Sequence, residues 1–91
     1  MLVALMAKDK EGALEIRKAN REAHVAYLKA SDAVMQAGPF LDDTGKMIGS
    51  LIILDVDTMQ EAKDWAAGDP YKNADLFQSV ELIQWNRVIG G

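Results

Sequence analysis

Residues 47–56, with the sequence MIGSLIILDV, decide the fold that we expect for this chain of 91 residues. Their β-branched and aliphatic side chains predict a strand. Both alternating sets of side chains are apolar in the middle of the segment, so neither face of the strand suits water. If helices cover one face of the sheet, a second copy of the sheet is the simplest cover for the other.

Three further strands are predicted around this segment. Residues 34–40 precede it, and the connection LDDTGK at residues 41–46 carries the Asp and Gly residues of a hairpin turn. A short apolar run at residues 2–6 predicts the first strand, which we expect to end at the charged residues 8–10. Residues 79–89 alternate apolar and charged side chains and predict the fourth strand.

Two helices are predicted between these strands. Residues 11–34 are rich in good helix formers and contain no glycine or proline after Gly12. The sequence TMQE at residues 58–61 fits a capping box, and the helix that it starts should end at Gly68, before a rigid Asp-Pro-Tyr exit. The order is βαββαβ, which predicts a ferredoxin-like α+β fold: a four-stranded antiparallel sheet with two helices on one face. We expect one domain over residues 1–91.

Composition narrows the classes of partner and compartment. The net charge of −4, without a run of lysine or arginine, argues against nucleic acid as a partner. The absence of cysteine excludes disulfides, thiolate nucleophiles and cysteine-bound metals. No segment is long enough to cross a membrane and the apolar start lacks a basic leader, so we expect a cytoplasmic protein without membrane contact. A core this small also favours a homodimer.

His24 is the only histidine, and it falls within the apolar arc of the long predicted helix. Leu28 lies roughly 40° from it around the helix axis at about 100° per residue. Arg17 and Arg21 share its stripe through i, i+4 and i+7 spacing, and burying such groups without partners would be costly. One interpretation is a packed histidine beside arginines that reach solvent. A metal site is not expected, because one histidine without clustered carboxylates does not make one.

A chemical role for His24 requires a partner, and Asp69 is the candidate. As the residue that follows the second helix, it would gain from a nearby imidazolium at the negative end of the helix dipole. It is equally an ordinary turn aspartate before proline. Ser50 follows a strand glycine and is either structural or a hydroxyl for a ligand. Pro39 and Tyr71 are predicted to shape the mouth of a pocket.

The helix sequence from Arg17 to Leu28 resembles the R-x-x-H-x-x-(Y/H)-L signature of the YciI-like (YCII-related) family. In this chain Arg21 and His24 take the first two positions, and Tyr27 and Leu28 the last two. Further blocks resemble the family in order: AGP at residues 37–39, DTG at 43–45, GS at 49–50, DPY at 69–71, and the aromatic residues Phe77 and Trp85. The resemblance covers essentially the whole chain.

The resemblance implies a dimeric α+β barrel and an active-site pair that falls on His24 and Asp69. It implies acid–base chemistry without a cofactor, in which Asp69 fixes the histidine tautomer while the other ring nitrogen exchanges a proton. Isomerisation, dehydrohalogenation or lactone-type rearrangement of a small aromatic or enolisable compound would suit such a pair. Arg17 or Arg21 would attract an anionic substrate. A non-catalytic module for small-molecule binding and a pure dimerisation domain remain open as alternatives.

Overall fold

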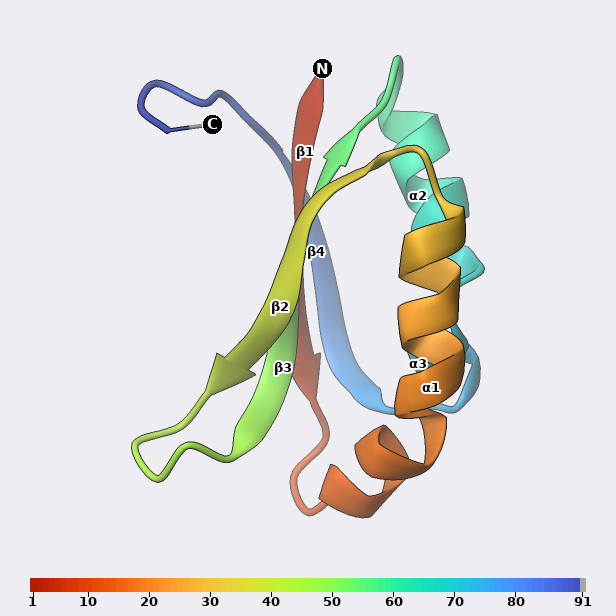
Figure 1. The fold of residues 1–91 in the computed structure, drawn as a ribbon, viewed down its shortest axis with the longest axis vertical. Helices are drawn as coiled ribbons and strands as arrows, with labels where there is room; N and C mark the ends of the chain where they lie inside the picture. Colours follow the sequence, from red (N-terminus) through yellow and green to blue (C-terminus); the bar gives the residue numbers. More distant parts are fainter. Residues whose placement is uncertain (91) are drawn as a thin grey trace.

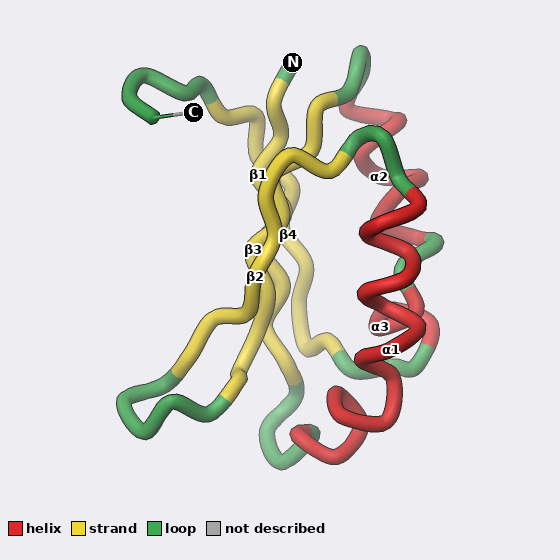
Figure 2. The backbone as a smooth tube through the Cα atoms, in the orientation of Figure 1, coloured by secondary structure: helices red, strands yellow, loops and turns green. Residues whose placement is uncertain are grey.

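The computed structural model describes residues 1–90. Its elements follow the order β1 (Leu2–Asp9), α1 (Leu14–Ala30), β2 (Val34–Leu41), β3 (Met47–Asp55), α2 (Met59–Ala67), α3 (Pro70–Asn73) and β4 (Phe77–Trp85). The strands form one antiparallel sheet in the order β2-β3-β1-β4. The helices all lie on one side of this sheet (Figure 1), and Figure 2 shows the same two layers along the backbone. The predicted ferredoxin-like α+β fold is confirmed.

The bounds of several elements differ from the prediction. Strand β1 continues through the charged residues to Asp9, because Lys8 points to solvent while Asp9 turns inward and is buried. Helix α1 is shorter than predicted, since its N-terminal turn begins after Gly12, which adopts a positive φ of 72°, and Val34 already belongs to β2. Strand β4 ends at Trp85, so the predicted extension to Ile89 was wrong.

The predicted capping box of α2 is present, with one difference in its partners. The Thr58 hydroxyl accepts from the Glu61 amide at 3.2 Å, whereas the Glu61 carboxylate accepts from the amide of Asp57, the residue before the cap, at 3.2 Å. Gly68 ends the helix in a right-handed conformation. A Cβ atom there would lie 2.5 Å from the Tyr27 hydroxyl. Close approach of α1, and not a left-handed turn, therefore requires this glycine.

The core lies between the sheet and the helices. Val3, Leu5, Ile52 and Leu54 from the central strands are at most 1% exposed, and Trp65 of α2 packs against them. Burial of each such side chain stabilises the fold by about 1.5 to 3 kcal/mol. This layer fixes α1 and α2 across the sheet, and so it fixes the side chains that these helices direct toward it.

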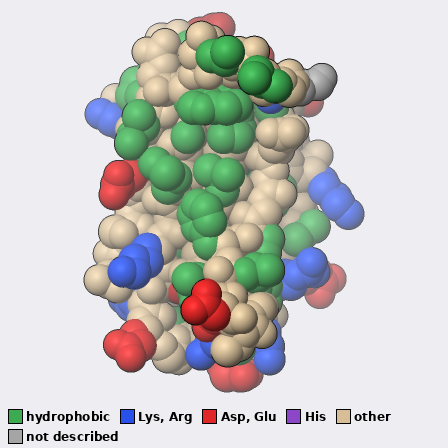
Figure 3. Space-filling model, turned by 90° about the vertical axis from the view of Figure 1, so that its left-hand side faces the viewer, with side chains coloured by type: hydrophobic (Ala, Val, Ile, Leu, Met, Phe, Trp, Pro, Cys, Tyr) green, Lys and Arg blue, Asp and Glu red, His purple; other side chains and the backbone are tan. Residues whose placement is uncertain are grey.

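The opposite face of the sheet is not covered by a helix. Phe40, Leu51, Ile53, Ile83 and Trp85 lie on this face by strand register, and Ile83 is 50% exposed. Figure 3 shows hydrophobic side chains gathered along it. Both faces of the central strands are thus apolar, as residues 47–56 predicted. No helix within residues 1–90 has the length and apolarity needed to span a bilayer.

Candidate functional site

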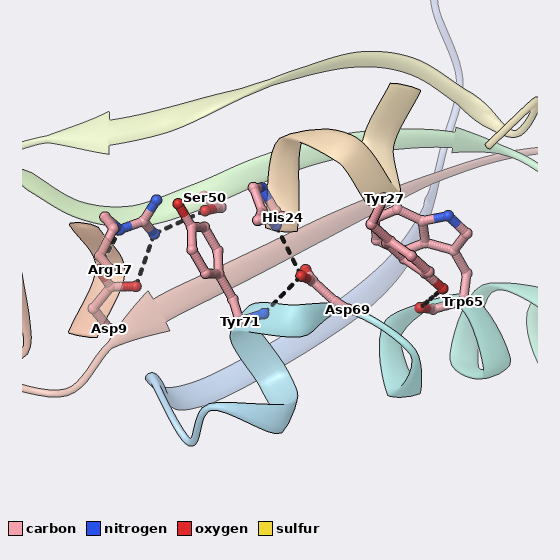
Figure 4. A network of polar contacts seen from close by, with 8 residues as sticks. All are labelled: Asp9, Arg17, His24, Tyr27, Ser50, Trp65, Asp69 and Tyr71. Atoms are coloured by element: carbon pink, nitrogen blue, oxygen red, sulfur yellow. Dashed lines mark hydrogen bonds and ion pairs between the residues drawn. The ribbon is translucent and has the colours of Figure 1, made fainter. Parts of the chain in front are cut away.

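A pocket of about 170 Å³ lies between α1, α3 and the strands β2 and β3. Six of the predicted site residues line it: Arg17, Arg21, His24, Pro39, Ser50 and Tyr71. The rest of the wall is formed by glycine and by apolar side chains of α1, β2 and β3, which sequence reasoning did not assign to a site. The seventh predicted residue, Asp69, does not line the pocket but contacts His24 from behind (Figure 4).

His24 and Asp69 form a buried pair. His24 Nδ1 lies 2.8 Å from Asp69 Oδ1, although the two residues are 45 positions apart, and their side chains are 8% and 1% exposed. The same carboxylate oxygen accepts a hydrogen bond of 3.0 Å from the Tyr71 amide. Since an ionised carboxylate only accepts, the His24 Nδ1–H donates, and Nε2 has no hydrogen-bond partner among residues 1–90.

Asp69 lies between two helix ends, of which the sequence predicted one. It is the N-cap of the short helix α3, whose first residue is Pro70, and its carboxylate faces the start of that helix. The C-cap of α2 is the preceding residue, Gly68. Asp69 therefore directly follows α2, as predicted, but its role as the N-cap of α3 was not predicted; this cap bond and the contact with His24 hold its carboxylate between α3 and α1.

Tyr71 supports the histidine ring. The two rings are stacked with centroids 3.8 Å apart and planes at 11°, and the tyrosine is 2% exposed. Tyr71 is thus a buried inner wall of the pocket, whereas it was predicted at the mouth. Burial raises the pKa of its phenol, although the nearby Arg17 guanidinium acts in the opposite direction. The phenol therefore keeps its proton at neutral pH.

Arg17 is held by a partner that sequence reasoning missed. Its Nε and Nη2 donate to the two carboxylate oxygens of Asp9 at 2.7 and 2.9 Å, and Nη2 also donates to the Ser50 hydroxyl at 2.8 Å. Burial lowers the pKa of Arg17, but the hydrogen bond and charge of Asp9 outweigh this and raise it, so the guanidinium stays charged. The signal for Asp9 was its period-two spacing from Val3 on the buried face of β1.

Arg21 and Pro39 lie at the outer part of the pocket. Arg21 is exposed and forms no ion pair with any of residues 1–90. Arg17 and Arg21 share one stripe of the helix, but only Arg17 is buried. Pro39 of β2 pairs in register with Ser50 of β3, which places both on the pocket side of the sheet. Gly49 allows this arrangement, because a Cβ atom there would collide with the carbonyl of Ala7 on β1.

The family model of the YCII-related domain matches residues 1–86. The chain belongs to the YCII-related family. An uncharacterised protein from Haemophilus influenzae is 36% identical over 97 aligned positions, which cover 97% of this chain and 99% of the relative. Protein YciI from Escherichia coli is 31% identical with the same coverage.

The YCII-related chain is also similar to a solved structure whose ligand is known. This is the 5-chloro-2-hydroxyhydroquinone dehydrochlorinase TftG from Burkholderia phenoliruptrix, in complex with 2,5-dihydroxybenzoquinone. The two chains are 30% identical, each is covered to 94%, and the TM-score is 0.87. The backbone that carries the pocket is therefore shared with an enzyme that acts on a single substituted ring.

Proposed function

We propose that this protein is a cofactor-independent enzyme that performs general acid–base chemistry on a small aromatic or enolisable compound. The observation that carries the proposal is the 2.8 Å contact between His24 Nδ1 and Asp69 Oδ1 at the wall of the pocket. A histidine oriented by a buried carboxylate, with its second nitrogen free, is the arrangement that general bases and acids use.

In this proposal His24 Nε2 takes a proton from the substrate, and Asp69 stabilises the imidazolium that forms. In an isomerisation, the proton returns to a different atom of the same compound. In a dehydrohalogenation of a halogenated hydroquinone, the ring first shifts to its keto form, in which one hydroxyl proton has moved to the halogen-bearing carbon. His24 then takes the proton of the hydroxyl group para to that carbonyl. The O–H electron pair forms the second carbonyl of the quinone, the ring double bond shifts, and halide leaves with the pair of the carbon–halogen bond. The proton then passes from His24 to solvent, so the histidine is regenerated.

The size of the pocket supports a single ring as the substrate. A cavity of roughly 150 Å³ in another protein holds benzene, so a pocket of about 170 Å³ has room for one substituted ring. The similarity to a dehydrochlorinase of a chlorinated hydroquinone favours dehydrohalogenation among the three reaction types. In the same proposal Pro39 and Tyr71 contact the ring. Arg21 and Ser50 bind its polar substituents, and Arg17 holds the Ser50 hydroxyl in place.

The test uses 5-chloro-2-hydroxyhydroquinone and follows chloride release. His24→Ala should lower kcat by about 100-fold or more, because positioned proton transfer contributes at that level. Lys63→Gln, a change of an exposed residue on α2, should leave the rate unchanged and serves as the matched control. Unchanged turnover in a folded His24→Ala protein would remove the histidine from the mechanism. A wild-type protein that binds the ring without releasing chloride or forming an isomer would favour a binding module.

We also propose that a second copy of the chain covers the open face of the sheet. The apolar side chains on that face, among them Ile83 and Trp85, are exposed in the single chain, and their burial would contribute about 25 cal/mol per Å². Ile83→Asp should convert a dimer to a monomer in sedimentation equilibrium. A wild-type protein that sediments as a monomer at micromolar concentration would contradict this part of the proposal.

A further inference from the structure

Ser50 presents an unused hydrogen-bond donor. It is 2% exposed, lines the pocket, and accepts a hydrogen bond of 2.8 Å from Arg17 Nη2. A serine hydroxyl carries one hydrogen and two acceptor lone pairs. Arg17 occupies an acceptor position, and none of residues 1–90 accepts a hydrogen bond from the Ser50 hydroxyl. Its hydrogen is therefore available to a molecule in the pocket.

The direction of the hydrogen bonds behind Ser50 is fixed. A guanidinium only donates, and Asp9 takes two of the Arg17 hydrogens in a bidentate pair that sets the plane of the group. Arg17 thus donates to Asp9 on one side and to Ser50 on the other. Figure 4 shows these three side chains in a row beside Tyr71.

The polar wall of the pocket offers donors and positive charge and has no carboxylate. Both carboxylates of the region lie behind it, Asp9 against Arg17 and Asp69 against His24. Tyr71 remains protonated because burial raises its pKa, and Arg21 at the outer edge has no ionic partner among residues 1–90. Such a wall complements an electron-rich oxygen on the ligand.

We propose that Ser50 donates a hydrogen bond to an anionic ring oxygen, a phenolate or enolate, of the bound compound. This inference rests on the proposed function, which places a small ring in the pocket. Ser50 is then a residue that touches the ligand, whereas Arg17 and Asp9 are positioning residues that act through it. Arg21 supplies the cation that draws the anion in. The two arginines therefore have different roles.

The probes for the test are 2,5-dihydroxybenzoquinone, a vinylogous acid that ionises, and its neutral dimethyl ether. Binding of each is measured by titration calorimetry at pH 7 with the whole protein. Ser50→Ala should weaken binding of the ionised probe about tenfold or more, the scale of a hydrogen bond to a charged group. The ether should change by less than about twofold, since it carries no anionic oxygen. Ser50→Thr keeps the hydroxyl and should retain most of the affinity.

Two further variants separate this role from a structural one. Arg17→Lys keeps the charge but cannot hold Asp9 and Ser50 together, so it should lose the preference for the ionised probe. In a Ser50→Ala background the same change should add little, because both act through one hydrogen bond. Thr44→Ala removes a hydroxyl from the distant hairpin and is the matched control. Thermal melting of each variant establishes that it is folded, and Ser50→Cys replaces Ser50→Ala should that variant fail to fold.

Several results would overturn the inference. These are unchanged binding of the ionised probe in Ser50→Ala, equal losses for both probes, and a wild-type protein with no preference for the ionised probe. The proposed function fails by a different result, unchanged turnover in His24→Ala. Loss of probe discrimination in Ser50→Ala together with unchanged turnover in His24→Ala would leave the inference standing and reject the acid–base mechanism.

Discussion

Two buried pairs of a basic side chain with a carboxylate lie close together in this protein, Arg17 with Asp9 and His24 with Asp69. Both pairs join α1 to another element and both are almost completely shielded from solvent. They differ in how fully they are paired. Both oxygens of Asp9 accept from Arg17, whereas Asp69 Oδ2 is buried and has no hydrogen-bond partner among residues 1–90.

This difference follows from the shape of the two cations. A guanidinium matches a carboxylate with two parallel N–H groups, but an imidazole offers one. The first pair keeps a fixed charge and a fixed geometry. The second contains an imidazole, which can both take and give a proton. Similar ingredients therefore give a positioning pair in one place and a candidate reactive pair in the other.

The largest effect should come from breaking the fixed pair. Asp9→Asn leaves a buried guanidinium without its counter-charge and should lower the free energy of unfolding by about 3 to 5 kcal/mol. Urea denaturation measures this change. Asp75→Asn is the matched control, because its ion pair with Lys10 is exposed and its loss should not shift the midpoint measurably. A midpoint for Asp9→Asn that matches the control would show that the pair is not structural.

The close approach of Gly68 to Tyr27, next to Asp69 in the sequence, should give the next effect. Gly68→Ala places a Cβ atom against the Tyr27 hydroxyl and should cost about 1 to 3 kcal/mol through overpacking. Tyr27→Phe removes that hydroxyl and should relieve part of the cost, which a double-mutant cycle in urea measures. Strictly additive costs would mean that the two groups do not compete for the same space.

Asp69→Asn should lower turnover more than it lowers stability, which is the opposite of what we expect for Asp9→Asn. We expect a loss of about 1 kcal/mol in stability, because one hydrogen bond is weakened and the cap bond to the Tyr71 amide can persist. Turnover of the chlorinated hydroquinone should fall about tenfold or more, since the histidine loses its orienting acceptor. A stability loss as large as that of Asp9→Asn with normal turnover would make both pairs structural.

The smallest effect concerns the pH dependence of stability, to which Tyr71, whose ring contacts both pairs, contributes. Burial raises the pKa of Tyr71, which contacts both His24 and Arg17. The folded state then binds more protons than the unfolded chain above pH 10, the ordinary tyrosine pKa. The contribution of Tyr71 to stability is complete below pH 10 and is lost as pH rises through its pKa in the folded state. Tyr71→Phe should therefore flatten the alkaline fall of stability, measured by urea midpoints from pH 8 to 11; an unchanged slope would contradict this assignment.

The sequence predicted those features that depend on one element at a time. The period of the strands identified the sheet and its two apolar faces, and the helical stripe placed Arg17 and His24 on one face of α1. The same stripe failed for Arg21, which is exposed because the packing of α1 against the sheet and α3 covers only part of that arc. Asp9 was taken for the end of a strand, since a charged residue at that position is normally solvated.

Local periodicity is set by backbone geometry. The sequence by itself therefore determined the order of the four strands and of α1 and α2, the two apolar faces of the sheet and the buried direction of His24, but not the short helix α3. Only the tertiary structure decided which carboxylate each cation meets. Asp9 reaches Arg17 across a turn, and Asp69 reaches His24 across 45 residues, because α1 and α3 are packed against each other beside one sheet. Such pairings depend on distances between elements, which no spacing within a single element contains.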